Sequence, residues 1–156
     1  MNKFLISFLT LCAISGPAIS QSTIPSSEDN ASLPVEATAD NLQVNNSENS
    51  AVFSGNAKVI QGMLDLQANT ITVFFEDGAQ NIKSVTAIGQ VKFTNGQETA
   101  KAKKAQFDVA SQVVTFTGSV VLRQTQTILT GNKLTYNITT GRSQMSGNVK
   151  TVFVPE

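Results

Sequence analysis

The residue types that usually carry catalysis are scarce in this chain. Its 156 residues include no histidine and no tryptophan, and the single cysteine is Cys12. The commonest general base and the commonest metal ligand are therefore missing. A carboxylate pair for glycoside hydrolysis would have to come from Asp40, Asp65, Glu98 or Asp108, and nothing in the sequence positions them. We expect no enzymatic activity, no catalytic residue, no metal site and no cofactor.

Acidic residues also do not recur at equivalent positions of the internal repeat that is described below. Glu76-Asp77 falls at a predicted turn, where a solvated loop tip is the plain interpretation. The repeat described below places Asn69, Lys103 and Asn132 at the positions equivalent to Asp40. Calcium bound between repeats would need an oxygen ligand of negative charge at several of these positions, so this class of site is excluded.

One basic cluster, Lys101, Lys103 and Lys104, allows two interpretations. It is either a solvated strand end or a contact for an anionic head group. The whole chain has 11 basic and 11 acidic residues. This balance argues against nucleic acid as a partner, because non-specific electrostatic binding to backbone phosphates needs an excess of positive charge.

A 29-residue internal repeat gives the chain its organisation. Small residues are followed by a glycine after 16, 21, 16 and 16 residues, and each glycine is followed by the next small residue after 13. The pairs are Ala39 and Gly55, Ala68 and Gly89, Ala102 and Gly118, and Gly131 and Gly147. The second unit therefore carries a five-residue insertion. Repetition at a fixed period predicts one supersecondary unit stacked on copies of itself.

Within each unit, apolar residues alternate with polar ones at period two, as in Phe53-x-Gly55-x-Ala57-x-Val59-x-Gln61. This is the pattern of a β-strand with one buried face. The alternation breaks just after each small residue, which predicts a bulge or bend there. Each in-phase glycine suggests a second bend or the close approach of another segment. We expect an all-β, antiparallel meander that rolls over to cover its apolar face.

Turn signals separate the expected strands. Asn95-Gly96, within residues 94–97, is a strong two-residue hairpin signal. Further turns are expected at residues 45–49, 76–78 and 139–142. Residues 100–107 are rich in alanine and lysine, but their match to the other units favours a strand over a helix.

The N-terminus predicts export. A short basic start precedes the apolar run Phe4–Ile14, and Ala18-Ile19-Ser20 offers small residues for cleavage before Gln21. We expect a cleavable signal peptide at residues 1–20, with a retained anchor helix or a lipoprotein acylated at Cys12 as alternatives. Residues 21–34 are polar and hold two prolines, which predicts a disordered leader. Residues 35–155 remain for one domain.

The apolar face mixes large and small side chains, which could leave a groove rather than a filled interior. The candidate lining residues taken from the in-phase pattern are Leu42, Val44, Phe53, Val73, Val91, Phe116 and Tyr136.

Several segments resemble the LptA/OstA family of lipopolysaccharide transport proteins. They are LPVEATAD at residues 33–40, AVFSGNAKVIQG at 51–62, FTGSVVLRQ at 116–124, GNKLTY at 131–136 and VKTVFVP at 149–155. Ser119 departs from the family's pattern, which has asparagine there. So does Ala105, where a larger residue is common.

The resemblance implies a β-jellyroll that shelters lipid acyl chains, a periplasmic location and the lipid A part of lipopolysaccharide as ligand. It also implies head-to-tail stacking of copies through the edges at 35–39 and 149–154, and docking to LptC-type inner-membrane and LptD-type outer-membrane partners. Carried over by position, it adds Val35, Ala37, Phe93, Phe107 and Val109 as lipid-facing residues. Two alternatives stay open: an LptC-like subunit of the same fold, and a structural repeat protein that binds no lipid.

Overall fold

The computed structural model describes residues 33–77 and 81–153. The predicted signal peptide and all but the last two residues of the predicted leader lie outside these ranges. Ten strands form one antiparallel sheet. They are β1 (Glu36–Thr38), β2 (Asn41–Asn45), β3 (Ser50–Gln61), β4 (Leu64–Phe75), β5 (Ile82–Asn95), β6 (Glu98–Asp108), β7 (Val113–Gln124), β8 (Thr127–Asn137), β9 (Ser143–Ser146) and β10 (Lys150–Phe153). The expected all-β antiparallel class is confirmed.

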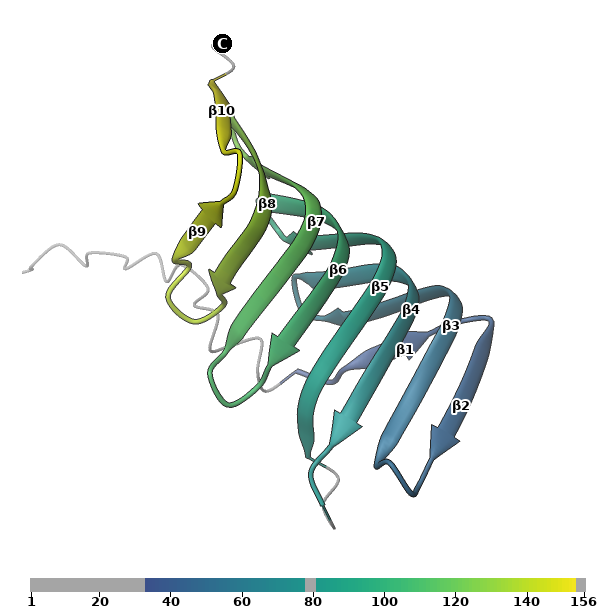
Figure 1. Cartoon of the computed structure of the whole chain (residues 1–156). Helices are drawn as coiled ribbons and strands as arrows, with labels where there is room; N and C mark the ends of the chain where they lie inside the picture. Colours follow the sequence, from purple (N-terminus) through teal and green to yellow (C-terminus); the bar gives the residue numbers. More distant parts are fainter. Residues whose placement is uncertain (1–32, 78–80, 154–156) are drawn as a thin grey trace, which may run out of the picture.

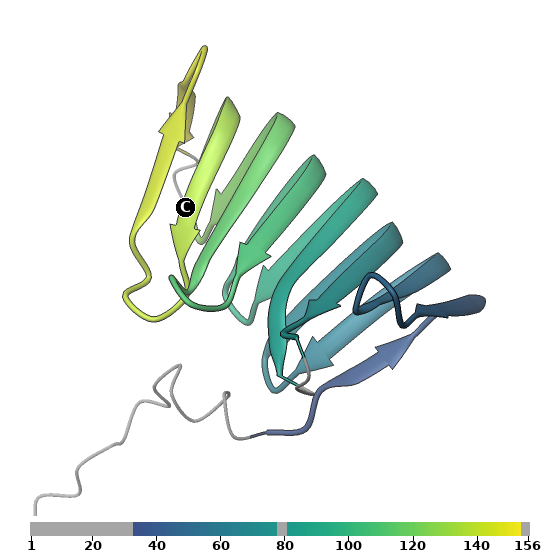
Figure 2. The same cartoon turned by 60° about the horizontal axis from the view of Figure 1, so that its bottom comes forward.

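Consecutive strands from β3 to β8 pair as a meander, and the short strands lie at the two ends of the sheet. β1 and β2 both pair with β3, whereas β9 and β10 both pair with β8. The long strands lie side by side, and each bends over (Figures 1 and 2). Among the described residues no helix is long and apolar enough to cross a membrane.

The bends divide the sheet into two walls that share a corner. Wall A comprises β2, β9 and residues 50–54, 70–75, 82–88, 104–108, 113–117 and 133–137. Wall B comprises β1, β10 and residues 57–61, 64–68, 91–95, 98–102, 120–124 and 127–131. The register of the sheet is interrupted between the two sets, for example between Ser54 and Ala57.

The corner is where the in-phase glycines lie, each followed by a second residue with positive φ. At Gly118 and Ser119 the φ angles are +85° and +51°. A Cβ added to Gly118 would lie only 2.8 Å from the Cβ of Lys103 on the neighbouring strand. The glycine is therefore required both by its left-handed backbone and by the close approach of that side chain. The bend expected at this position from the sequence is present.

Small residues line the inside of the same corner. Ala68 and Ala102 are buried and pair with Ala57 and Val91 on adjacent strands. At the equivalent position Gly131, an added Cβ would lie 2.6 Å from Met145 Cγ. The inside of the corner is thus too crowded for larger side chains.

The hairpin turns within the described residues fall where the sequence places them, with one shift, and the turn expected at 76–78 lies partly outside the described residues. β5 ends at Asn95 and β6 begins at Glu98, and these two residues pair. The central turn residues are therefore Gly96 and Gln97, not Asn95 and Gly96 as the Asn-Gly signal predicts. This register places the bulky Phe93 opposite the small Ala100, and both are buried. Side-chain packing in the interior therefore sets the register of the β5–β6 hairpin, although the Asn-Gly pair alone favours a different register. Residues 100–107 are strand, as the repeat indicates.

The interior between the walls as the candidate functional site

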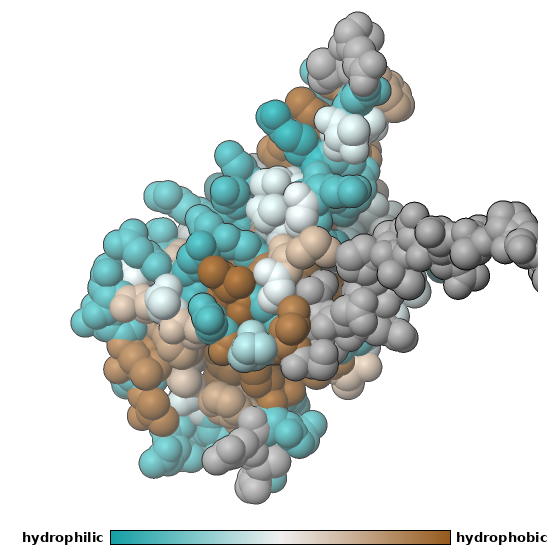
Figure 3. All heavy atoms as spheres, turned by 180° about the vertical axis from the view of Figure 1, so that it is seen from behind, coloured by the Kyte–Doolittle hydropathy of each residue, from teal (hydrophilic) through white to brown (hydrophobic). Residues whose placement is uncertain are grey.

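The two walls enclose an apolar interior built from alternate residues of every long strand. Its core is a cluster of buried side chains, including Ile71, Val91, Phe116, Val120 and Leu134. The intervening residues on each strand point outward and are mostly polar. Seen from behind, apolar residues gather in the middle of one face, bordered by hydrophilic residues (Figure 3).

The structure brings together most of the residues expected to line a groove. Val73, Val91, Phe93, Phe116 and Tyr136 are buried in the core cluster. Phe53 and Phe107 are partly buried and pack against that cluster.

The other expected lining residues lie at the margins. Val35, Leu42 and Val44 are exposed at one end of the sheet, and Val44 is 64% exposed. Ala37, in β1, is exposed as well, and Val109 lies just beyond the end of β6. Phe153, in β10, is 75% exposed at the opposite end. Apolar side chains therefore face solvent at both ends of the folded sheet.

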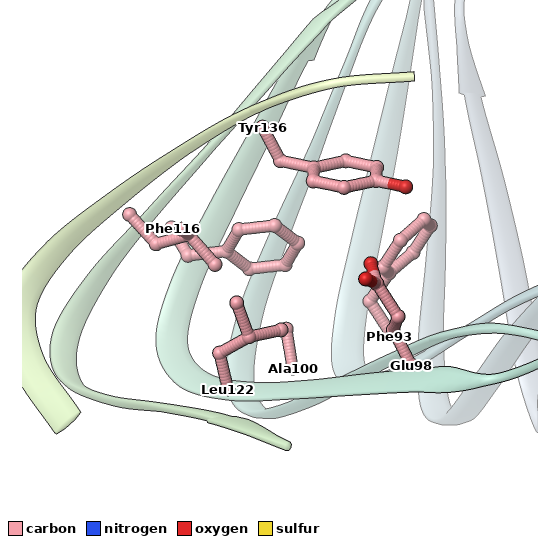
Figure 4. A pocket seen from close by; sticks show the side chains of 7 residues that line it. Phe93, Glu98, Ala100, Phe116, Leu122 and Tyr136 are labelled. Carbon is pink, nitrogen blue, oxygen red and sulfur yellow. The ribbon is translucent and has the colours of Figure 1, made fainter. Parts of the chain in front are cut away.

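The interior is filled around Phe93, which differs from the groove expected from the sequence. Phe93 from wall B packs against two rings from wall A, with centroid distances of 5.7 Å to Phe116 and 6.2 Å to Tyr136. Both tilted arrangements lie in the favourable range for aromatic pairs. The cavity between them has a volume of about 10 Å³ (Figure 4). It has room for about one water molecule and none for an acyl chain.

The small residues explain why no groove remains. Ala100 pairs with Phe93, and Ala105 pairs with Phe116. Each ring occupies the space above a small neighbour on the next strand. The alternation of large and small side chains therefore fills the interior in this conformation, instead of leaving it hollow.

Polar side chains also enter this interior, and sequence reasoning did not assign them to the site. Asn95 Nδ2 in wall B donates a hydrogen bond of 2.8 Å to the Tyr136 hydroxyl oxygen in wall A. Gln124 Nε2 donates to Glu98 Oε1 over 2.6 Å. Glu98 and Tyr136 both line the central cavity (Figure 4). A usable signal was available, because Asn95, Glu98 and Gln124 each continue the inward phase of their strand by two residues.

Burial raises the pKa of the Tyr136 phenol. The hydrogen bond from Asn95 lowers this pKa, whereas the charge of Glu98 and its hydrogen bond with the phenol raise it further. In the described residues no buried polar side-chain atom lacks a partner. The polar groups of the interior are thus accommodated as a network, and a neutral phenol is the favoured form.

The outer faces are polar and carry most of the charge. Lys92 and Lys101 pair directly across β5 and β6, both exposed, on the outside of wall B. An ion pair joins Lys58 and Asp65 over 3.2 Å on the same face. At the β6–β7 turn, hydrogen bonds from Ser111 lower the pKa of Asp108. Within residues 33–77 and 81–153, no group of three or more potential metal ligands comes together.

Comparison with known proteins places the chain in a family. The profile described as LptA/(LptD N-terminal domain) LPS transport protein matches residues 36–142. This chain belongs to that family. The family consists of transport proteins, which agrees with the expectation that the chain is not an enzyme.

Three relatives illustrate the similarity. An uncharacterized protein of Rhizobium meliloti (strain 1021) is 29% identical over 120 residues, which cover 72% of this chain and 64% of that protein's length. The lipopolysaccharide export system protein LptA of Haemophilus influenzae is 24% identical, with coverage of 82% and 81%. LptA of Escherichia coli (strain K12) is 26% identical, with coverage of 78% and 71%.

A solved structure shares the fold. The crystal structure of LptH from Pseudomonas aeruginosa, described as the LptA-homologous periplasmic component of the lipopolysaccharide transport device, superposes with a TM-score of 0.74. The match covers 84% of this chain and 100% of LptH at 19% identity. The folded sheet described above is therefore a β-jellyroll of the LptA type.

Proposed function

We propose that this LptA-family member is a periplasmic carrier that shelters the acyl chains of lipopolysaccharide between its two walls on the way from the inner to the outer membrane. The observation that carries the proposal is an apolar interior enclosed by two walls of one sheet, with exposed apolar side chains at both ends. Each methylene left in water costs about 0.8 kcal/mol, so a chain gains much by moving inside. No chemical step on the lipid is required.

Because the middle of the interior is filled, loading requires the walls to move apart or the aromatic rings to turn aside. The walls can move apart because the two halves of the sheet are continuous only at the corner. Phe93, Phe107, Phe116 and Tyr136 then become the residues that contact hydrocarbon in the middle of the protein. Val35, Ala37, Leu42 and Val44 contact it at one end.

The proposal is tested by photocrosslinking to purified lipopolysaccharide. A photoreactive residue at Phe107 or Phe53, both inward and partly buried, is expected to crosslink. The matched outward positions are Thr72, between inward Ile71 and Val73, and Lys92, between inward Val91 and Phe93. Crosslinks that form at Thr72 and Lys92 but at no inward position would contradict the proposal.

The proposal extends to assembly through the sheet edges. In the described residues no strand pairs with the outer edges of β1, β2, β9 or β10. An unpaired edge invites addition of another strand. We expect copies to stack head to tail there, and LptC-type and LptD-type partners to dock at the same edges. Replacing Leu42 and Val44 by lysine is expected to weaken concentration-dependent self-association in sedimentation velocity, whereas Thr72→Lys on the outer face leaves it unchanged.

Two alternatives remain distinguishable. The filled middle favours a structural protein of the same fold that binds no lipid, and crosslinking that fails everywhere would support it. An LptC-like subunit would retain its N-terminal segment as a membrane anchor. Sequencing the N-terminus of the exported protein separates that alternative from a carrier whose residues 1–20 are removed.

A further inference from the structure

A polar contact joins the two walls at the margin of the interior, next to the aromatic rings that fill it. Asn95, at the end of β5, and Tyr136, near the end of β8, are 41 residues apart in sequence. Strands β6 and β7 separate β5 from β8 in the sheet, so their hydrogen bond crosses the interior from wall B to wall A. Glu98 lines the same small cavity as Tyr136, and Gln124 on the neighbouring strand donates a hydrogen bond to the Glu98 carboxylate.

This arrangement brings polar groups to the margin of an apolar interior, because the partly buried Asn95 and Glu98 flank the β5–β6 turn. The Tyr136 phenol and the Glu98 carboxylate line the cavity together with Phe93, Leu122 and Ala100 (Figure 4), and the Asn95 amide bonds to the phenol. Packing alone would be served by phenylalanine at position 136, because the ring already contacts Phe93. The hydroxyl adds a directional link between the walls.

We infer that Asn95, Glu98 and Tyr136 form a clasp that holds the two walls together in the unloaded protein and controls the entry of acyl chains. The inference rests on the proposed carrier function and adds to it the residues that determine when the interior opens. The cavity beside the clasp, about 10 Å³, is far too small for hydrocarbon. An acyl chain therefore binds only to molecules in which the bonds between the walls have broken.

Only molecules with an open clasp bind lipid, so the apparent affinity for lipid equals the affinity of the open form multiplied by the fraction of molecules that are open. Removing one of its bonds raises the open fraction. A net intramolecular hydrogen bond corresponds to a change of about 2- to 10-fold in such an equilibrium. Removal of the Tyr136 hydroxyl should therefore tighten lipid binding, although it removes a stabilising contact from the folded protein.

Tyr136→Phe is the direct test, with binding of the fluorescent polyene fatty acid cis-parinaric acid as the readout. We expect about 2- to 10-fold tighter binding by the variant and a lower melting temperature. A hydrogen bond with a purely structural role would lower stability without tightening binding. The matched control is Gln67→Met, which removes a side-chain bond to Asp65 on the outer face of wall B and should leave binding unchanged.

A second measurement follows the walls themselves. Spin labels at Thr94→Cys in wall B and Thr135→Cys in wall A lie on outward positions next to the clasp. Their separation in the otherwise wild-type protein is expected to increase when lipopolysaccharide is added. Lipid binding with an unchanged separation and with no tightening by Tyr136→Phe would overturn the clasp alone. Failure of wild type and variant to bind either lipid would overturn the clasp and the carrier function together.

Discussion

Lys103 lies directly over Gly118 at the corner of the folded sheet, on the neighbouring strand. The space between them is too small for even a methyl group, since a Cβ at Gly118 would lie 2.8 Å from Lys103 Cβ. The same relationship joins Asn69 to Gly89 and Asn132 to Gly147. The corner that separates the two walls therefore depends on a glycine beneath a side chain from the next strand.

Gly118→Ala should destabilise the protein by about 2–4 kcal/mol, because it combines a left-handed backbone with a steric clash. The control is Gly141→Ala, whose φ is +66° but whose added Cβ would meet nothing within 4 Å. Backbone strain alone should cost about 1–2 kcal/mol there. Urea unfolding of the two variants measures both values. Equal destabilisation would show that the approach of Lys103 does not matter.

Lys101→Glu should stabilise the sheet, because Lys101 lies directly opposite Lys92 and like charges across a strand pair repel. Both residues are exposed, so the gain is small, about 0.2–1 kcal/mol, and it should shrink at high salt. Lys104→Glu is the matched control, because Lys104 pairs with Ile88 and Thr117. Thermal unfolding at low and high ionic strength gives the comparison. A larger gain at position 104 would contradict the cross-strand explanation.

Phe107→Glu should abolish most lipid crosslinking and lower stability only moderately. Phe107 is partly buried and packs at the margin of the core cluster, where a carboxylate can still reach water. A charge at this place would meet hydrocarbon when the interior is loaded, and burying it is costly. Gln106→Glu changes the adjacent, exposed residue and should bind lipid as the wild type does. Crosslinking yield and circular dichroism melting curves distinguish loss of binding from loss of folding.

The Tyr136 phenol should titrate above its ordinary pKa, because burial disfavours the phenolate. A folded-state pKa above the unfolded value makes the protein lose stability as pH rises beyond the unfolded pKa of about 10. Tyr136 is the only tyrosine, so its absorbance titration can be read directly. Adding denaturant should return the titration to its ordinary range. Titration at an unshifted pKa in the folded protein would show that the phenol is not buried as described.

Much of the fold follows from local patterns in the sequence. Period-two alternation, as in Phe53 to Gln61, identifies strands because successive side chains point to opposite faces. The glycine and small-residue phase identifies the corner, because glycine suits the positive φ found at Gly118 and a small residue suits the crowding found at Gly131. The same alternation marks Asn95, Glu98 and Gln124 as inward, but a prediction that rests on apolar character passes over these polar residues.

The sequence by itself determined which residues are strands, which face of the long strands is apolar and where the long strands bend, since these depend on neighbours close in the chain. The tertiary structure decided whether the apolar faces enclose space or fill it. That outcome depends on the meeting of Phe93, Phe116 and Tyr136 from opposite walls, and on the register that seats Phe93 beside Ala100. Contacts across the interior join residues far apart in sequence, and their fit is set by the volumes of side chains that no local pattern compares.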